Sequence, residues 1–182
     1  PYLVSHPQHG WAEQDPEALW RAACQGISLC LEQACALPGQ IAGVGVDGQS
    51  WSCVAVDDTG SVLMDTPIWM DTRADEICME TQAHIGATRL FTVSGNPFRP
   101  SYTTPKILWM QKHMPAVYKN ARWFLQCNSF LVYRLTGRVS QDVSQGYGLH
   151  VFDIEKKPYY PVLCRARGID IQTLPTIYES HR

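Results

Sequence analysis

The sequence lacks any apolar run of the ~18–20 residues that a membrane-spanning helix requires, and no signal-peptide pattern opens it. It also lacks a charge excess, because 15 basic residues are balanced by 17 acidic ones and the formal net charge is −2. No basic stripe is present that could neutralise a phosphate backbone. We therefore expect a cytoplasmic protein that binds neither membranes nor nucleic acids. A homodimer is an alternative that the sequence leaves open.

A disulfide pattern is also missing, although the chain contains seven cysteines. Their number is odd, no two stand in a C-x-x-C motif, and they are scattered through apolar segments, which favours a reducing compartment. Cys24, Cys30 and Cys35 are spaced closely enough to suggest a metal cluster. Free cysteines usually behave as small hydrophobic residues, however, so we predict that these three are buried on one helix.

The length of 182 residues suits one domain of ordinary size and is too short for two large ones. Hydrophobic residues make up 45% of the chain, which is enough for a core. We therefore treat residues 1–182 as a single domain.

Hydrophobic periodicity predicts a first helix, then a run of strands, then mostly helices. Asp15 before Pro16 is a typical helix start, and Leu37-Pro38-Gly39 would end that helix. Short turns between the middle strands favour antiparallel pairing, and the order of elements predicts an α/β fold with a mixed sheet flanked by helices. The expected strands cover 41–46, 51–56, 61–64, 67–70 and 123–126, and the later helices cover 71–84, 101–113, 128–135 and 159–166.

One glycine motif is misleading. Gly43, Gly45 and Gly48 match G-x-G-x-x-G, but a dinucleotide site needs this motif between a strand and a helix. Here the first two glycines fall inside a predicted strand and another strand follows, so no helix N-terminus faces a pyrophosphate. We expect the glycines to permit close approach of a neighbouring backbone or a ligand.

Residues 101–113 read Ser-Tyr-Thr-Thr-Pro-Lys-Ile-Leu-Trp-Met-Gln-Lys-His. A hydroxyl of Thr103 or Thr104 could cap a helix, and Pro105 suits its first turn. Spacing alone describes an ordinary core helix, but the whole string resembles the first signature of the FGGY carbohydrate kinases. The residues that fill the signature positions are Ser101, Thr103, Lys106, Ile107, Trp109, Met110, Lys112 and His113.

Three other stretches are similar to this family in the family's own order: residues 9–17, 69–73 and 136–144. The resemblance implies a ribonuclease-H/actin-like ATPase domain, here a truncated N-terminal lobe. It implies ATP and Mg²⁺ for the complete enzyme, while the family's first strand, catalytic Asp and ATP-binding second domain lie outside this chain. No catalytic, cofactor-binding or metal-binding residue is therefore assigned within these residues, and the chain alone is expected to be inactive.

A small-molecule sugar is the implied substrate, and the loop before the strand 51–56 is its predicted site. Gln49 and Ser50 offer hydrogen bonds to sugar hydroxyls, and Trp51 offers an apolar surface, although a loop cap and a core residue would explain them equally well. Xylulokinase-like members read Gly-Gln-Met-His-Gly here and contact the ketose through Met-His. Gly48 and Gln49 match that pattern while the next three residues depart from it, which implies a ketose or polyol, with a pentulose such as xylulose first.

Trp69 and Asp71 belong to a Trp-x-Asp-x-Arg string that resembles the family's sugar-pocket segment. Asp71 could accept hydrogen bonds from sugar hydroxyls, or it or Thr72 could cap the next helix. Arg73 could pair with an acid or support the pocket, and a buried arginine–carboxylate pair would be structural. For Lys106, a structural ion pair is as plausible as substrate contact. A non-catalytic sugar-binding or regulatory relative of the kinases is the alternative function.

Overall fold

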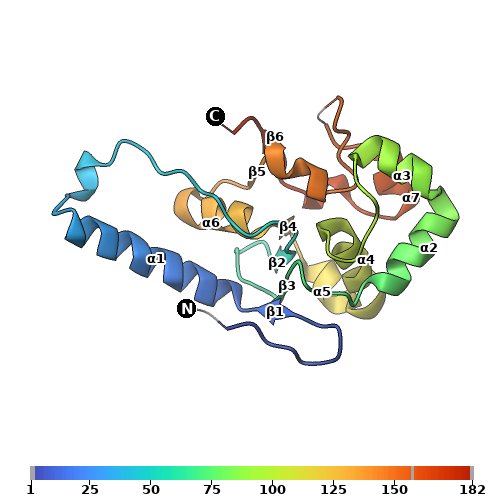
Figure 1. The fold of residues 1–182 in the computed structure, drawn as a ribbon, viewed down its shortest axis with the longest axis horizontal. Coiled ribbons are helices and arrows are strands. Elements are labelled where there is room, and N and C mark those ends of the chain that lie inside the picture. Colours follow the sequence, from blue (N-terminus) through green and yellow to red (C-terminus); the bar gives the residue numbers. More distant parts are fainter. Residues whose placement is uncertain (1–2, 157, 181–182) are drawn as a thin grey trace.

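The computed structural model describes residues 3–156 and 158–180. Helices and small sheets alternate along this part of the chain (Figure 1). The helices are α1 (Pro16–Gln33), α2 (Asp75–Ile85), α3 (Ala87–Ser94), α4 (Thr103–His113), α5 (Pro115–Asn120), α6 (Cys127–Thr136) and α7 (Pro161–Ala166). The strands are β1 (Glu13–Gln14), β2 (Val54–Val56), β3 (Thr66–Pro67), β4 (Trp123–Leu125), β5 (Ser140–Asp142) and β6 (Thr176–Tyr178). Short 3-10 turns cover Pro38–Gln40, Val143–Gly148 and Ile171–Thr173.

The strands form three two-stranded sheets of mixed direction. β1 pairs antiparallel with β3, and β2 pairs antiparallel with β4, with Val54 opposite Leu125. β5 and β6 are parallel, with Ser140 opposite Thr176. An antiparallel bridge between Val56 and Val62 confirms the predicted turn between the middle strands.

The core lies around β2, β4 and α4. Every residue of α4 from Thr103 to Met110 is buried, including the charged Lys106. The side chains of β2 and those of Phe124 and Leu125 on β4 are almost fully buried as well, whereas Trp123 is half-buried. The signature helix is therefore an internal element, and its burial explains why its sequence is apolar on more than one side.

The first helix begins as predicted. Asp15 is its N-cap and accepts a hydrogen bond of 2.8 Å from the backbone N–H of Glu17. The N-terminal half of α1 packs near α6, whereas the other half extends to the far left of the molecule in Figure 1. The predicted burial of three cysteines on this helix is therefore wrong: Cys30 and Cys35 are exposed, and Cys24 is half-buried.

The predicted strand over residues 41–46 is wrong. The segment is coil, and most of its apolar side chains are exposed, with Ile41 at 46% and Val44 at 62% of full accessibility. A strand needs a neighbour for its backbone hydrogen bonds, and no strand within 3–156 and 158–180 pairs with this segment. An apolar composition is typical of a buried strand, but it does not ensure that a neighbouring strand is present to accept the backbone hydrogen bonds.

The predicted caps of two helices are also wrong. α4 begins after Tyr102, and no side chain caps it, because the hydroxyl of Thr103 donates to the carbonyl of Ser52 instead. α2 begins at Asp75, with Ala74 at the N-cap position, so neither Asp71 nor Thr72 caps it. In both places tertiary contacts have taken the polar side chain that local sequence assigns to a cap.

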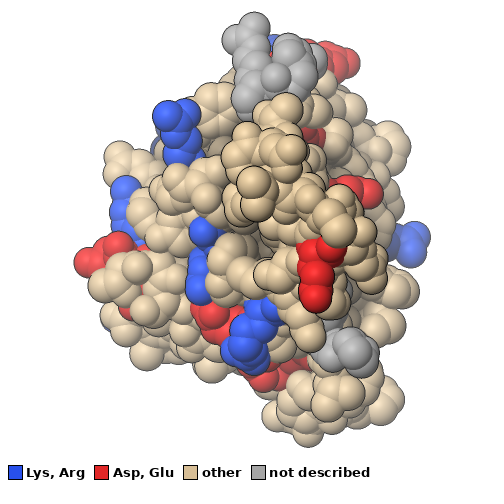
Figure 2. All heavy atoms as spheres, turned by 90° about the vertical axis from the view of Figure 1, so that its left-hand side faces the viewer, with Lys and Arg blue, Asp and Glu red and all other residues tan. Residues whose placement is uncertain are grey.

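The surface seen in Figure 2 carries scattered blue and red residues, with no continuous basic patch on this face. Among the described residues, no helix combines the length and the apolar character that crossing a membrane would demand.

Replacing the N-cap of α1 should weaken the protein measurably. Asp15→Ala removes the acceptor for the N–H of Glu17 and the partner of Arg21, and should lower the free energy of unfolding by about 1 kcal/mol. Urea titration followed by circular dichroism measures this change. Asp15→Asn keeps an acceptor oxygen and should recover most of the loss, whereas equal losses in both variants would contradict the capping role.

Candidate functional site

The loop 48–52 is anchored from two sides to the buried core. The backbone N–H of Trp51 donates to Oε1 of Gln126 at 3.0 Å, immediately before α6. The hydroxyl of Ser52 accepts from the N–H of Cys127 at 2.8 Å, and its carbonyl accepts from Thr103 on α4. Since Ser52 is fully buried, these bonds seat the loop on the first turns of α4 and α6.

Gln49 and Ser50 precede this anchor and are half-buried. Oε1 of Gln49 lies 4.0 Å from the sulfur of Cys127, a distance that permits only a weak S–H hydrogen bond. The amide and the hydroxyl therefore lie at the surface end of an otherwise fixed loop, where they remain polar candidates for a ligand.

The ring of Trp51 packs into an aromatic niche. Its centroid lies 4.6 Å from that of Tyr102 and 6.0 Å from that of Tyr147, the latter edge-on. Gly148 closes the niche, because a Cβ at that position would lie only 2.6 Å from Cδ1 of the indole. Sequence reasoning found Trp51 but missed these three neighbours, because they come from distant segments and no local pattern pairs them with Trp51.

The backbone of Trp51 is in the left-handed region, with φ at +65°. A bulky residue rarely adopts this conformation, because its Cβ crowds the backbone, and it persists only where surrounding contacts hold it. The indole N–H is buried and has no hydrogen-bond partner among the described residues. Unusual backbone geometry and an unpaired donor thus coincide at a residue predicted to bind sugar.

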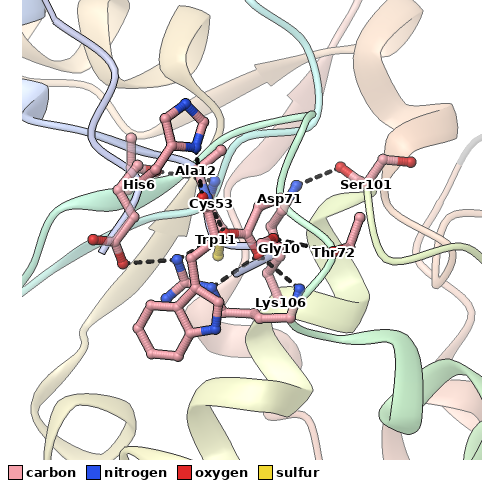
Figure 3. Close-up of polar contacts among 12 residues, drawn as sticks. His6, Gly10, Trp11, Ala12, Cys53, Asp71, Thr72, Ser101 and Lys106 are labelled. Atoms are coloured by element: carbon pink, nitrogen blue, oxygen red, sulfur yellow. Dashed lines mark hydrogen bonds and ion pairs between the residues drawn. The ribbon is translucent and has the colours of Figure 1, made fainter. Parts of the chain in front are cut away.

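Asp71 is fully buried in an ion pair with Arg73 (Figure 3). One carboxylate oxygen accepts from the backbone N–H and from Nε of Arg73, at 3.1 and 2.8 Å. The other accepts from Nη2 of Arg73 and from the N–H of Ala12, both at 2.7 Å. The predicted pairing of Arg73 with an acid is confirmed. A sugar hydroxyl would have to displace one of these donors, so contact between Asp71 and sugar stays a prediction.

The guanidinium of Arg73 has further partners. Nη2 lies 2.7 Å from the carboxylate of Glu13, and the group stacks 3.7 Å from the centroid of Trp11. The centroid of the Trp109 ring on α4 lies 5.0 Å from Cζ of the same guanidinium. These contacts tie the N-terminal segment, the loop after β3 and the signature helix together.

Trp69 stands at the surface of the same region and is 48% exposed. The N–H of Cys53 donates to the carbonyl of Pro67 at 3.3 Å, within the antiparallel arrangement around β2. Trp51 lies two residues before Cys53, and Trp69 lies two residues after Pro67. This hydrogen bond links the stretch that follows Trp51 to the stretch that precedes Trp69.

Lys106 is fully buried beneath the loop. Its ammonium donates to the carbonyl of Trp51 at 2.6 Å and to the carbonyl of Ser101. Its hydrogen-bond partners are thus two carbonyls instead of the carboxylate that an ion pair would provide. Burial lowers its pKa to about 7, because desolvation disfavours the charged form more than nearby Cys53 and Asp71 favour it.

Within residues 3–156 and 158–180, no group of three or more His, Cys, Asp or Glu side chains could hold a metal ion. Mg²⁺ in kinases is usually held by one or two carboxylates together with the phosphates of the nucleotide, so no Mg²⁺ ligand is assigned among the described residues. What the site can supply is hydrogen bonding from polar side chains and an aromatic surface, which is the chemistry that recognises a polyhydroxylated ligand.

The fold is similar to that of solved sugar-kinase structures. Xylulose kinase from Rhodospirillum rubrum superposes with a TM-score of 0.90, over 98% of this chain and 36% of that structure. The two sequences are 23% identical, so this likeness shows the fold alone.

Sequence comparison then gives the family. The profile of the "FGGY family of carbohydrate kinases, N-terminal domain" matches residues 1–182, and the chain belongs to that family. It is 29% identical over 176 residues to xylulose kinase from Escherichia coli (strain K12), and 28% identical over 179 residues to glycerol kinase from Thermococcus gammatolerans. These matches cover 97% and 96% of this chain but only 36% of each relative, so the chain spans about a third of their length.

Removing one partner of the buried ion pair should strongly destabilise the protein. Asp71→Ala leaves Arg73 with only Glu13 to balance it, and should lower the free energy of unfolding by about 3–5 kcal/mol. Thermal and urea unfolding would measure the loss. Asp58→Ala, at an exposed turn, serves as the matched control and should change stability little. A small loss at Asp71 would show that the pair does not hold this region together.

The depressed pKa of Lys106 predicts how stability changes with pH. The folded protein releases this proton near pH 7, whereas the unfolded chain keeps it up to the ordinary value of 10.5. Between these values the unfolded state binds more protons, so raising the pH stabilises the fold, by at most about 1.4 kcal/mol per pH unit.

Urea titrations between pH 7.0 and 7.8 would measure this slope, because most thiols of the unfolded chain, with an ordinary pKa of 9.0, stay protonated there. At higher pH the buried thiols of Cys53, Cys78, Cys127 and Cys164 oppose the trend, because burial raises their pKa to about 11 or about 12 while the unfolded chain releases these protons near pH 9. The slope should be missing in Lys106→Met. Parallel slopes in the two proteins would assign the effect to another group.

Proposed function

We propose that the complete protein containing this chain is an ATP-dependent carbohydrate kinase that phosphorylates a ketose or polyol hydroxyl, with a pentulose such as xylulose as first candidate. The observation that carries this proposal is the loop 48–52. It matches the Gly-Gln start of the xylulokinase-like pattern, is anchored to Gln126, and is followed by Cys53, which is hydrogen-bonded to Pro67 just before Trp69. The xylulose kinases among the relatives support the same reading.

The residues of this chain would contact the sugar and not the nucleotide. Gln49 and Ser50 would bind its hydroxyls, while Trp51 and Trp69 would cover its C–H face and exclude water. Asp71 and Arg73 would support the loop that carries Trp69, with or without direct contact from Asp71. When bound, ATP with Mg²⁺ supplies the phosphoryl group and offsets its charge. The groups that hold the nucleotide and remove the hydroxyl proton are proposed to lie outside these residues.

Two alternatives rest on specific observations. Glycerol kinases are also among the relatives, and the Ser50-Trp51-Ser52 replacement departs from the ketose-binding pattern, so a smaller polyol is the second candidate substrate. A non-catalytic sugar-binding relative would keep this site and form no ADP. A cytoplasmic location and a homodimer stay predictions from the sequence.

A substrate screen with the complete gene product tests the proposal. ADP release would be measured with D-xylulose, D-ribulose and glycerol, and we expect D-xylulose to give the highest kcat/KM. Trp69→Ala should raise the KM for the sugar at least ~10-fold with little change in the KM for ATP, because it removes binding surface and no reacting group. Phe91→Ala, a comparably exposed aromatic residue on α3, is the matched control.

The same assay separates the alternatives. Highest activity with glycerol would replace the ketose by a polyol, and sugar binding without ADP formation would favour the non-catalytic relative. The 182-residue chain by itself is expected to form no ADP. Turnover by that chain would place the catalytic groups within it and contradict the proposed division of roles.

A further inference from the structure

We propose that Lys106 is a positioning residue of the sugar site. Lys106 and Gln126 bind the backbone of Trp51 and so hold this residue in the left-handed conformation. The inference rests on the proposed function in one respect, namely that the loop 48–52 binds sugar. Lys106 would touch neither sugar nor nucleotide, and would act through the placement of Trp51.

Both backbone groups of Trp51 are held by side chains from other elements. Its N–H donates to Gln126, and its carbonyl accepts from the ammonium of Lys106 at 2.6 Å. The amide of Gln126 is fixed in turn, because its Nε2 donates to the carbonyl of Gln145 at 3.0 Å. The conformation of Trp51 is thus determined by α4 on one side and by the start of α6 on the other.

Such a clamp is needed because the conformation is unfavourable. At φ +65° a tryptophan crowds its own backbone, and a free loop would return to negative φ. The direction of the indole depends on this angle, since the Cα–Cβ bond turns with the backbone. Only the observed conformation places the ring against Tyr102 and beside Gly148, where no Cβ obstructs it.

The surroundings of Lys106 make these carbonyls its principal partners. The titratable groups that face it are Cys53 before β2, Asp71 and Arg73 after β3, and Cys127 on α6. The carboxylate of Asp71 is already committed to Arg73, and the thiols are held neutral by burial. A buried ammonium must be hydrogen-bonded, so it binds strongly to the carbonyls of Trp51 and Ser101.

The decisive measurement is the environment of Trp51 when the clamp is removed. The complete protein is labelled with 5-fluorotryptophan, and the fluorine resonance of Trp51 is assigned by its loss in Trp51→Phe. In Lys106→Met we expect this resonance to shift and broaden, while those of Trp20 and Trp123, which lie away from the loop, stay in place. Lys112→Met, on the exposed side of the same helix, should leave the Trp51 resonance unchanged.

Sugar kinetics provide the second measurement. Lys106→Met should raise the KM for the preferred sugar at least ~10-fold and change kcat less than ~3-fold, since positioning of a binding surface is lost and no reacting group is removed. A purely structural role would lower the yield of active protein and leave KM unchanged. An unchanged Trp51 resonance, or an unchanged KM beside normal turnover, would overturn the proposal.

A second variant covers the case in which Lys106→Met does not fold. Gln126→Met removes the other hydrogen bond to Trp51 and should give the same selective shift of its resonance. A Gln126→Met protein whose Trp51 resonance matches the wild type would count against the clamp. If no sugar is phosphorylated by any version of the protein, the proposed function fails, and the fluorine spectra still decide whether Lys106 positions Trp51.

Discussion

The burial of two basic side chains, Arg73 and Lys106, is the constraint on which this structure depends. The guanidinium of Arg73 and the ammonium of Lys106 are both fully removed from water, close enough for Arg73 to lower the pKa of Lys106. A buried charge is tolerated only when it is paired or fully hydrogen-bonded. The segments that supply those partners are therefore held in place by the electrostatic requirement as well as by apolar packing.

Arg73 and Lys106 find their hydrogen-bond partners in different ways, and each way fixes a different segment of the site. Arg73 takes two carboxylates and an aromatic face, which joins the segment around Trp11 to the loop after β3. Lys106 takes backbone carbonyls, one of them from Trp51. The first arrangement supports the segment that carries Trp69, and the second holds the loop before β2. Arg73 and Lys106, both buried, therefore support the two predicted sugar-binding segments, namely the one that carries Trp69 and the loop 48–52.

Much of this could be predicted from the sequence, wherever the signal is local. The N-cap at Asp15, the end of α6 at Gly137 and the antiparallel turn before Val62 follow from short-range rules that tertiary contacts leave unchanged. The family signature in α4 also identified a segment that is internal to the fold. The errors arose where a local signal depends on a distant partner, as for the unpaired segment 41–46 and the side chain of Thr103, which bonds Ser52 instead of capping its helix.

The sequence by itself determined the family, the order of most elements and the residues of the loop 48–52, because these are properties of adjacent amino acids. Only the tertiary structure decided how Trp51 is held. Its left-handed backbone, the niche formed by Tyr102, Tyr147 and Gly148, and the bond from Lys106 join segments up to about a hundred positions apart. No local pattern encodes such contacts, since a buried polar group takes whichever partner the folded chain brings within hydrogen-bonding distance.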